Sequence, residues 1–146
     1  MQVALVLSNS AKAKVLQRAA KYNVPTMVFD RQRFYQQQDV LEALHAHNID
    51  LVVLAGFMWL VPSYLIVAFP NRIVNIHPAL LPAYGGKGMY GDHVHKAVKA
   101  ARETKTGITI HYVNEAYDEG QIIFQAETAI NSTDTADKLL HLSLQP

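Results

Sequence analysis

An asparagine and a histidine two residues apart are the side chains of this sequence best suited to chemistry. Asn75 and His77 lie in the segment "RIVNIHP", and an extended backbone there would direct both side chains to the same side. Pro78 biases His77 away from the helical region. An amide N–H and an imidazole on one side can stabilise a developing oxyanion. A second interpretation stays open, because a histidine before a proline also occurs in purely structural roles.

A carboxylate later in the chain is needed to keep such a histidine charged. Asp118, in the turn "YDEG", is the best candidate. A neighbouring anion favours the imidazolium form and raises the pKa of a histidine. We therefore expect Asn75, His77 and Asp118 to meet around a carbonyl oxygen that gains negative charge.

The composition suits a single domain and excludes several kinds of site. Half of the 146 residues are apolar and the formal net charge is +1, which favours a buried core without a basic surface for nucleic acid or anionic membranes. The absence of cysteine removes disulfides, thiolate zinc sites and thiol nucleophiles, and fits a cytoplasmic enzyme. The longest apolar stretch, residues 49–69, contains Asp50, Gly56 and Pro62 and predicts strand, turn and helix instead of a membrane span.

Short apolar runs alternate with amphipathic segments through the chain, which predicts an α/β fold. We expect strands in residues 2–9, 24–30, 49–56 and 72–76, and helices in residues 11–23, 31–48, 62–70 and 91–104. Such alternation favours a parallel sheet with helices on both faces. Residues 107–115 and 121–130 predict a late antiparallel hairpin. Ligands of open α/β sheets bind beyond the carboxyl ends of the strands, where Gly56, Asn75 and His77 are expected.

Three segments carry a resemblance to a known family. "VVLAGFM", "VNIHPALLPAYGG" and "TIHYVNEAYDEGQIIFQ" resemble, in this order and spacing, the formyltransferases that use 10-formyltetrahydrofolate. The resemblance covers nearly the whole chain and implies a three-layer, mostly parallel, Rossmann-like sheet. It implies that His77 is the catalytic acid, Asn75 its partner donor and Asp118 the residue that holds His77 protonated.

The resemblance also implies the substrates. It is closest to the members that formylate the amine of glycinamide ribonucleotide in purine synthesis, with 10-formyltetrahydrofolate as co-substrate and no metal, because the histidine supplies the positive charge. A hydrolase of the same co-substrate and a non-catalytic folate-binding fragment are the alternatives. We expect small-molecule substrates, no nucleic acid or membrane partner, and a cytoplasmic location.

A folate pocket is implied on both sides of the catalytic residues. Arg33 falls where the family has an arginine near the folate, and Trp59 stands where many relatives have arginine. The expected pocket residues are Arg33, Met58, Trp59, Leu60 and Val61, and, in the loop before Asp118, Asn114, Glu115, Ala116 and Tyr117. Residues 57–61 could instead be plain core. The loop "GGKGMYG" is expected to be a mobile flap beside the site.

The ends of the chain are expected to differ from the family. Residues 1–146 are interpreted as a single formyltransferase domain that starts one strand–helix unit late and stops inside the helix after the hairpin. The first unit of the family carries a glycine- and asparagine-rich loop for the substrate's phosphate. A parallel sheet without its first strand exposes backbone donors and apolar surface, so we expect either marginal stability or a homodimer that covers the edge. We also expect weak binding of the phosphorylated substrate.

Overall fold

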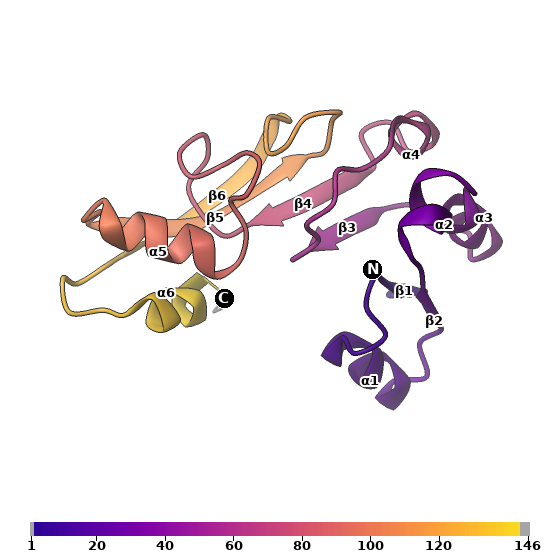
Figure 1. The fold of residues 1–146 in the computed structure, drawn as a ribbon, viewed down its shortest axis with the longest axis horizontal. Helices are drawn as coiled ribbons and strands as arrows, with labels where there is room; N and C mark the ends of the chain where they lie inside the picture. The colour runs from indigo at the N-terminus through magenta and orange to yellow at the C-terminus, as the bar shows by residue number, and fades with distance from the viewer. Residues whose placement is uncertain (1, 144–146) are drawn as a thin grey trace. The chain divides into compact units, whose positions relative to one another are not determined.

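Two compact units make up the chain, Met1–Asp50 and Leu51–Pro146. The computed structural model describes residues 2–143 (Figure 1). The first unit contains β1 (Val6–Ser8), α1 (Lys14–Lys21), β2 (Thr26–Val28), α2 (Arg31–Tyr35) and α3 (Asp39–Ala46). Its two strands pair in parallel, with Val6 opposite Thr26 and Ser8 opposite Val28.

The single helix predicted over residues 31–48 is divided in two. Asp30 caps α2, because its carboxylate accepts a hydrogen bond from the backbone N–H of Arg33 at 2.9 Å. Gln38 then has a φ of 51°, which ends helical geometry before α3 begins. The buried side chains agree better with the prediction, since Phe34, Val40 and Leu44 are all buried. The division falls in the glutamine run at residues 36–38, which offers no apolar side chain to continue the buried stripe.

The second unit contains a four-stranded mixed sheet. Its elements are β3 (Val52–Ala55), α4 (Ser63–Ala68), β4 (Ile73–His77), α5 (Asp92–Ala100), β5 (Lys105–Tyr112), β6 (Ile122–Ala129) and α6 (Ala136–Ser143). The strand order is β3-β4-β5-β6. β3 and β4 are parallel, whereas β4 with β5 and β5 with β6 are antiparallel. The expected α/β fold with a late antiparallel hairpin is therefore confirmed.

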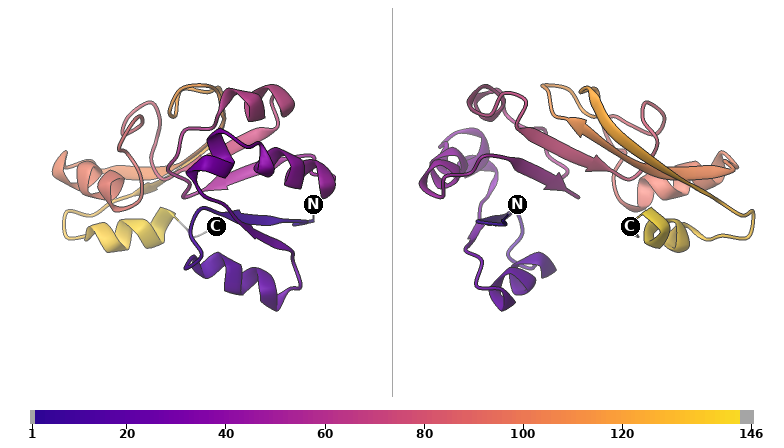
Figure 2. Two further views of the ribbon diagram at one scale, coloured as in Figure 1. Left: turned by 45° about the vertical axis from the view of Figure 1, so that its right-hand side comes forward. Right: turned by 180° about the vertical axis from the view of Figure 1, so that it is seen from behind.

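A small apolar core joins α5 and α6 to the segment that follows β4. The fully buried members are Ala79, Val94, Val98 and Leu139, from the segment after β4, from α5 and from α6. α5 and α6 lie side by side in all the views, and α6 also contacts β5 (Figure 2). This packing anchors the segment that follows His77.

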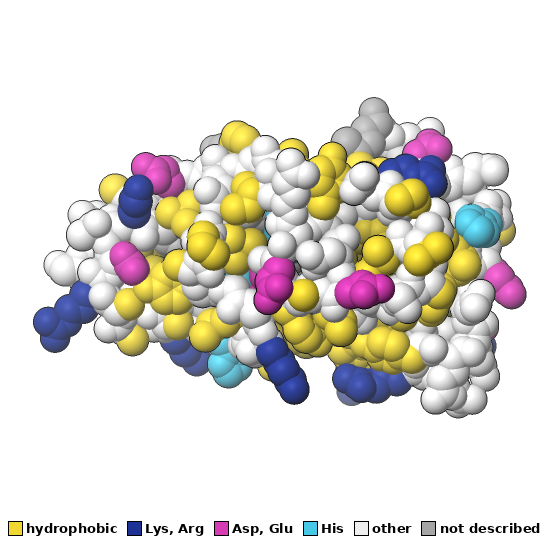
Figure 3. All heavy atoms as spheres, turned by 90° about the horizontal axis from the view of Figure 1, so that it is seen from above, with side chains coloured by type: hydrophobic (Ala, Val, Ile, Leu, Met, Phe, Trp, Pro, Cys, Tyr) yellow, Lys and Arg dark blue, Asp and Glu magenta, His cyan; other side chains and the backbone are white. Residues whose placement is uncertain are grey.

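One face of this sheet keeps apolar side chains in contact with solvent. Val53, Ile76 and Phe124 are 48%, 38% and 53% exposed. The strand register puts them on one face, because Ile76 is opposite Ile110 and Ile110 is opposite Phe124, while Val53 is opposite Val74. Figure 3 shows apolar side chains lying between charged groups of both signs on the side of the molecule that it draws. Among the helices of residues 2–143, none combines the length and apolar character that a membrane crossing requires.

Candidate active site

The predicted asparagine and histidine lie at the carboxyl end of β4, and both point into a cluster with β5. Asn75 is opposite His111, and His77 is opposite Thr109. Asp118 comes from the loop that connects β5 to β6. These neighbours are far apart in sequence, so the antiparallel pairing of β4 with β5 is what assembles the cluster.

The three predicted catalytic side chains meet around one carboxylate oxygen. Asp118 Oδ1 accepts a hydrogen bond from Asn75 Nδ2 at 3.3 Å and lies 3.4 Å from His77 Nδ1. The side chains of His77 and Asp118 are 3% and 10% exposed. Attraction between such charges is screened far less than it would be at the surface. The geometry is therefore compatible with the expected trio, although the catalytic roles stay predictions.

The turn that presents Asp118 is tightly constrained. Asp118 has a φ of 57°, in the left-handed region that aspartate tolerates better than most residues. A Cβ on Gly120 would lie only 1.6 Å from the Tyr112 carbonyl oxygen, so only glycine fits there. The "DEG" sequence thus brings the backbone of this loop close against the end of β5.

His111 is a fourth member of the cluster, and the motifs of the sequence did not single it out as part of the trio. Its Nε2 lies 3.1 Å from Asn75 Nδ2 and 3.5 Å from Asp118 Oδ1. Its Nδ1 donates to the Tyr112 carbonyl at 2.8 Å. The antiparallel register of β4 and β5 was the signal that could have revealed it.

Burial and hydrogen bonding set the charges in this cluster. Burial raises the pKa of Asp118, but the hydrogen bond with His111, the charge of His77 and the Gly86 N–H outweigh it, so the net shift is downward. Burial is also the largest influence on the pKa of His77 and lowers it. Asp118 and the Tyr84 carbonyl offset this only in part, while His111 adds to the lowering. Asp118 thus raises the pKa of His77, as expected, but by less than burial lowers it, and the role of Asp118 in holding His77 protonated stays a prediction.

The glycine-rich loop over residues 82–91 lies directly against the trio. His77 Nε2 donates to the Tyr84 carbonyl at 2.7 Å, and the Gly86 N–H donates to Asp118 Oδ2 at 3.0 Å. The Tyr84 hydroxyl donates to Glu103 at 2.7 Å and ties the loop to the end of α5. The loop expected beside the site, residues 85–91, thus reaches it through Gly86, and its mobility stays a prediction.

A buried hydroxyl fixes the segment between His77 and that loop. Thr109 Oγ1 accepts from the Leu81 N–H at 3.0 Å and donates to the Ala79 carbonyl at 2.7 Å. Gln125 Nε2 donates to both Thr109 Oγ1 and the Leu81 carbonyl, each at 2.9 Å. Neither residue was predicted to matter, since no motif marks a structural hydroxyl in a strand.

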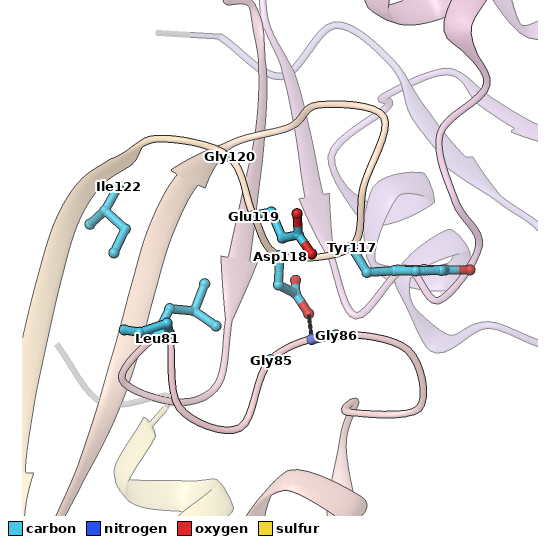
Figure 4. Close-up of a pocket in the computed structure, with 9 residues that line it drawn as sticks. Leu81, Gly85, Gly86, Tyr117, Asp118, Glu119, Gly120 and Ile122 are labelled. Carbon is cyan, nitrogen blue, oxygen red and sulfur yellow. Dashed lines mark hydrogen bonds between the residues drawn. The ribbon is translucent and has the colours of Figure 1, made fainter.

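A cleft of about 440 Å³ opens beside Asp118, within the size range of small-molecule sites. Its lining residues are Leu81, Pro82, Gly85, Gly86, Tyr117, Asp118, Glu119, Gly120 and Ile122. Figure 4 shows the Asp118 carboxylate directed toward Gly86, with Leu81 and Ile122 on one side and Tyr117 on the other. Of the trio, Asp118 lines the cleft, so a ligand there would contact its carboxylate, while Asn75 and His77 lie behind it.

The expected folate residues are distributed unevenly around the site. Tyr117 lines the cleft, whereas Asn114, Glu115 and Ala116 precede it in the same loop and are not part of the lining. Asn114 shapes that loop, because its side-chain oxygen accepts from the Ala116 N–H at 3.0 Å.

The other residues expected to bind folate, Arg33 and residues 58–61, do not line this cleft either. Met58 is 47% exposed and Val61 is 5% exposed, while Trp59 packs edge-on against Phe57 with ring centroids 5.9 Å apart. Leu60 is half-buried. Arg33 belongs to the first unit, where its guanidinium lies 3.3 Å from Asp39. Folate binding by all these residues stays a prediction. Within residues 2–143, no group of three or more His, Asp or Glu side chains is arranged to hold a metal ion.

Comparisons with known proteins show the family to which this fold and these three residues belong. The model of the formyl transferase family matches residues 1–143, so this chain belongs to the formyl transferase family. It is 39% identical over 142 residues to the chloroplastic phosphoribosylglycinamide formyltransferase of Arabidopsis thaliana, covering 94% of this chain and 49% of that protein. It is 36% identical to the phosphoribosylglycinamide formyltransferase of Bacillus subtilis, covering 93% of this chain and 69% of that protein.

Solved structures that resemble this chain are also of phosphoribosylglycinamide formyltransferases. The crystal structure of phosphoribosylglycinamide formyltransferase from Anaplasma phagocytophilum matches with a TM-score of 0.86 and 34% identity, over 96% of this chain and 64% of that one. The Bacillus halodurans enzyme matches with a TM-score of 0.85 and 37% identity, over 97% and 72%. A formyltetrahydrofolate deformylase from Pseudomonas syringae, at 23% identity and a TM-score of 0.81, shares the fold. The chain spans about half the length of the plant relatives, 49% and 45%.

Proposed function

We propose that this chain carries the formyl-transfer site of a phosphoribosylglycinamide formyltransferase. The substrates would be 10-formyltetrahydrofolate and the amine of glycinamide ribonucleotide. The observation that carries the proposal is the meeting of Asn75, His77 and Asp118 at one carboxylate oxygen beside an open cleft. Membership of the formyl transferase family and the names of its relatives support the choice of substrates.

The proposed reaction breaks one carbon–nitrogen bond and forms another. The amine nitrogen attacks the formyl carbon, and negative charge develops on the formyl oxygen. The Asn75 amide and the His77 imidazolium stabilise that charge, and removing such a donor typically lowers a rate by about 10²–10³. Asp118 accepts a proton from the attacking amine, N10 of the folate takes up a proton as its bond to carbon breaks, and formylated amine and tetrahydrofolate result.

The lowered pKa of His77 is compatible with this role. A neutral ring is favoured by burial, but negative charge developing on the formyl oxygen would favour the imidazolium form. The proton is therefore held most strongly when the transition state needs it. A histidine whose pKa lies near or below neutrality also gives up its proton readily as an acid.

Loop movement is part of the proposed mechanism. His77 Nε2–H is bonded to the Tyr84 carbonyl, and Asn75 Nδ2 faces His111 and Asp118. A formyl oxygen has to replace at least one of these internal partners before either donor can serve it. We expect residues 82–91 to shift away from His77 when substrate binds in the cleft.

Replacing His77 by Ala tests the proposal. We expect formyl transfer to fall by about 10²-fold or more, with folate binding measured by fluorescence retained within a few-fold. His47→Ala is the matched control, because His47 is an exposed histidine at the end of α3 whose ring bonds to the Ala43 carbonyl at 2.9 Å. Turnover by His77→Ala equal to that of the control would remove this histidine from the mechanism.

Tetrahydrofolate release with and without glycinamide ribonucleotide separates the alternatives. Release only with the amine supports transfer, release without it supports a hydrolase, and folate binding without release supports a non-catalytic module. A cytoplasmic location and a homodimer stay predictions for imaging and sedimentation experiments, and the Arabidopsis relative is named chloroplastic.

A further inference from the structure

A buried histidine on β5 shares its partners with two of the proposed catalytic residues. His111 is opposite Asn75 in the strand register, and its side chain is 3% exposed. It lies 3.1 Å from the Asn75 amide nitrogen and 3.5 Å from Asp118 Oδ1. The mechanism proposed above gives it no role.

The hydrogen-bond partners of His111 fix one of its two protons. Nδ1 lies 2.8 Å from the Tyr112 carbonyl, which can only accept a hydrogen bond, so Nδ1 carries hydrogen. Only Nε2 can then gain or lose a proton. In the neutral ring Nε2 is an acceptor, and in the charged ring it is a donor.

The neutral ring occupies the Asn75 amide. Nε2 then accepts one N–H of Asn75, and the other N–H donates to Asp118 Oδ1 at 3.3 Å. Both N–H groups of the amide are then hydrogen-bonded to other protein side chains. Neither is available to an oxygen in the active site.

The charged ring releases one of them. An Nε2–H cannot accept from the amide, so it turns to Asp118 Oδ1, and Asn75 keeps only its bond to Asp118. Turning the amide over instead would bring the Asn75 side-chain oxygen close to the Asp118 oxygen, which is unfavourable. In either arrangement an Asn75 N–H no longer belongs to His111.

We infer that His111 is a positioning residue whose protonation decides whether an N–H of Asn75 is free to bind the formyl oxygen. The catalytic meaning of this inference rests on the proposed function. The coupling between the two side chains does not, because it is a property of the protein alone.

The surroundings of His111 make the charged form accessible. The titratable groups that face it within the described residues are His77 from β4 and Asp118 from the loop after β5. Burial lowers the pKa of His111, but the Asp118 hydrogen bond, the Tyr112 carbonyl and the Asp118 charge together raise it above its ordinary value. The released amide is therefore expected below the raised pKa and is lost as the pH rises through it.

A nuclear magnetic resonance titration tests the coupling without any assay of activity. The side-chain amide resonances of Asn75, identified by their loss in Asn75→Asp, are followed together with the His111 ring from pH 5 to 9. We expect both to change with one midpoint, and the change at Asn75 to disappear in His111→Phe. His93→Phe, at an exposed histidine of α5, is the control and leaves the titration unchanged.

Activity measurements then give the catalytic consequence. In His111→Phe we expect kcat to fall by roughly tenfold, with KM for each substrate within about threefold, because Asp118 loses the charged His111 donor and no longer orients the Asn75 amide. The part of the pH dependence of kcat that follows the His111 midpoint is lost as well. His111→Gln, which keeps a polar amide in the buried site, is the second variant if the Phe variant fails to fold.

The outcomes separate this inference from the proposed function. Asn75 resonances that do not follow the His111 midpoint overturn the inference, even if formyl transfer is robust. Coupled resonances in a chain that transfers no formyl group uphold the positioning of Asn75 and overturn the proposed function. Coupled resonances with an unchanged kcat and pH profile in His111→Phe overturn the catalytic part of the inference.

Discussion

Two neighbouring segments that follow His77 are held in very different ways. Residues 79–81 are bonded to the sheet through a Thr109 hydroxyl that is itself fully buried. Residues 82–91 are held by bonds to the proposed catalytic side chains, by one exposed tyrosine–glutamate hydrogen bond, and by Tyr84 and Met89, which are partly buried against the core. The polar contacts of the first segment are with the sheet, whereas those of the second are mainly with the proposed site.

This difference distinguishes the part of the protein that positions the proposed catalytic groups from the part that substrate must displace. Catalytic groups need support that fixes them to within a fraction of an ångström, and for the proposed groups on β4 the sheet supplies it, with Thr109 holding the segment that follows His77. Substrate needs partners that can be displaced, and the loop offers the Tyr84 carbonyl and the Gly86 N–H. We expect substitutions on the first side to cost stability and substitutions on the second to alter the loop with little loss of stability.

Gly107→Ala should have the largest effect on stability. A Cβ at Gly107 would lie 2.0 Å from the Ala126 carbonyl oxygen and 2.7 Å from a Leu80 methyl group. The oxygen belongs to the neighbouring strand β6 and cannot yield without breaking the pairing, so we expect a loss of about 3 kcal/mol or more in the free energy of unfolding. Urea denaturation measures it.

Gly88→Ala, on the loop, is the matched comparison for Gly107→Ala. No atom lies within 4 Å of its added Cβ, but its φ of +90° strains any other residue. We expect a loss of only about 1 kcal/mol from that strain. Equal losses at the two glycines would show that the loop is as firmly built as the sheet.

Thr109→Val tests the fastening of residues 79–81 directly. Valine has the shape of threonine without the hydroxyl, so the Leu81 N–H and the Ala79 carbonyl lose their partner in a buried site. Each unsatisfied group costs about 1–3 kcal/mol, so we expect a total loss of about 2 kcal/mol or more, with Gln125 losing one of its two acceptors and keeping the Leu81 carbonyl.

Thr106→Val, on the same strand, is the control for this hydroxyl. Thr106 is 2% exposed and its hydroxyl has no hydrogen-bond partner among the described residues. Replacing an unsatisfied buried hydroxyl by a methyl group is expected to be neutral or slightly stabilising. The prediction is wrong if the two threonines respond alike in denaturation experiments.

The side chains that carry the proposed chemistry could be found from the sequence, and their supports could not. The residue types of Asn75, His77 and Asp118, and the spacing of the first two, were enough to predict a site that stabilises an oxyanion. His111 joins them only through the pairing of β4 with β5, and a register irregularity between Ile110 and His111 affects its pairing with β6. No pattern of side chains in the sequence predicts such a shift in strand register.

The other features that the sequence did not predict also depend on the backbone or on three-dimensional packing. The Tyr84 carbonyl and the Gly86 N–H are backbone groups, so residue types give no sign that they bind His77 and Asp118. The pKa of His77 depends on how completely the ring is buried, a three-dimensional quantity that residue types do not reveal, and burial lowers this pKa more than Asp118 raises it. The alternation of strands and helices was predictable because it depends on local periodicity, whereas the division of residues 31–48 depends on one left-handed residue.

Tyr84→Phe should have the smallest effect on stability and the most informative effect on the loop. Its hydroxyl bond to Glu103 is exposed, so we expect a loss below about 0.5 kcal/mol. Without that tether the Gly86 N–H should exchange with solvent several-fold faster, because its bond to Asp118 opens with the loop. Hydrogen exchange measured by mass spectrometry on residues 82–91 reports this, and Tyr90→Phe, at an exposed tyrosine of the same loop, is the control. Exchange that is unchanged in Tyr84→Phe would mean that the contacts with His77 and Asp118 alone hold the loop, and that substrate must displace them without help from a loosened tether.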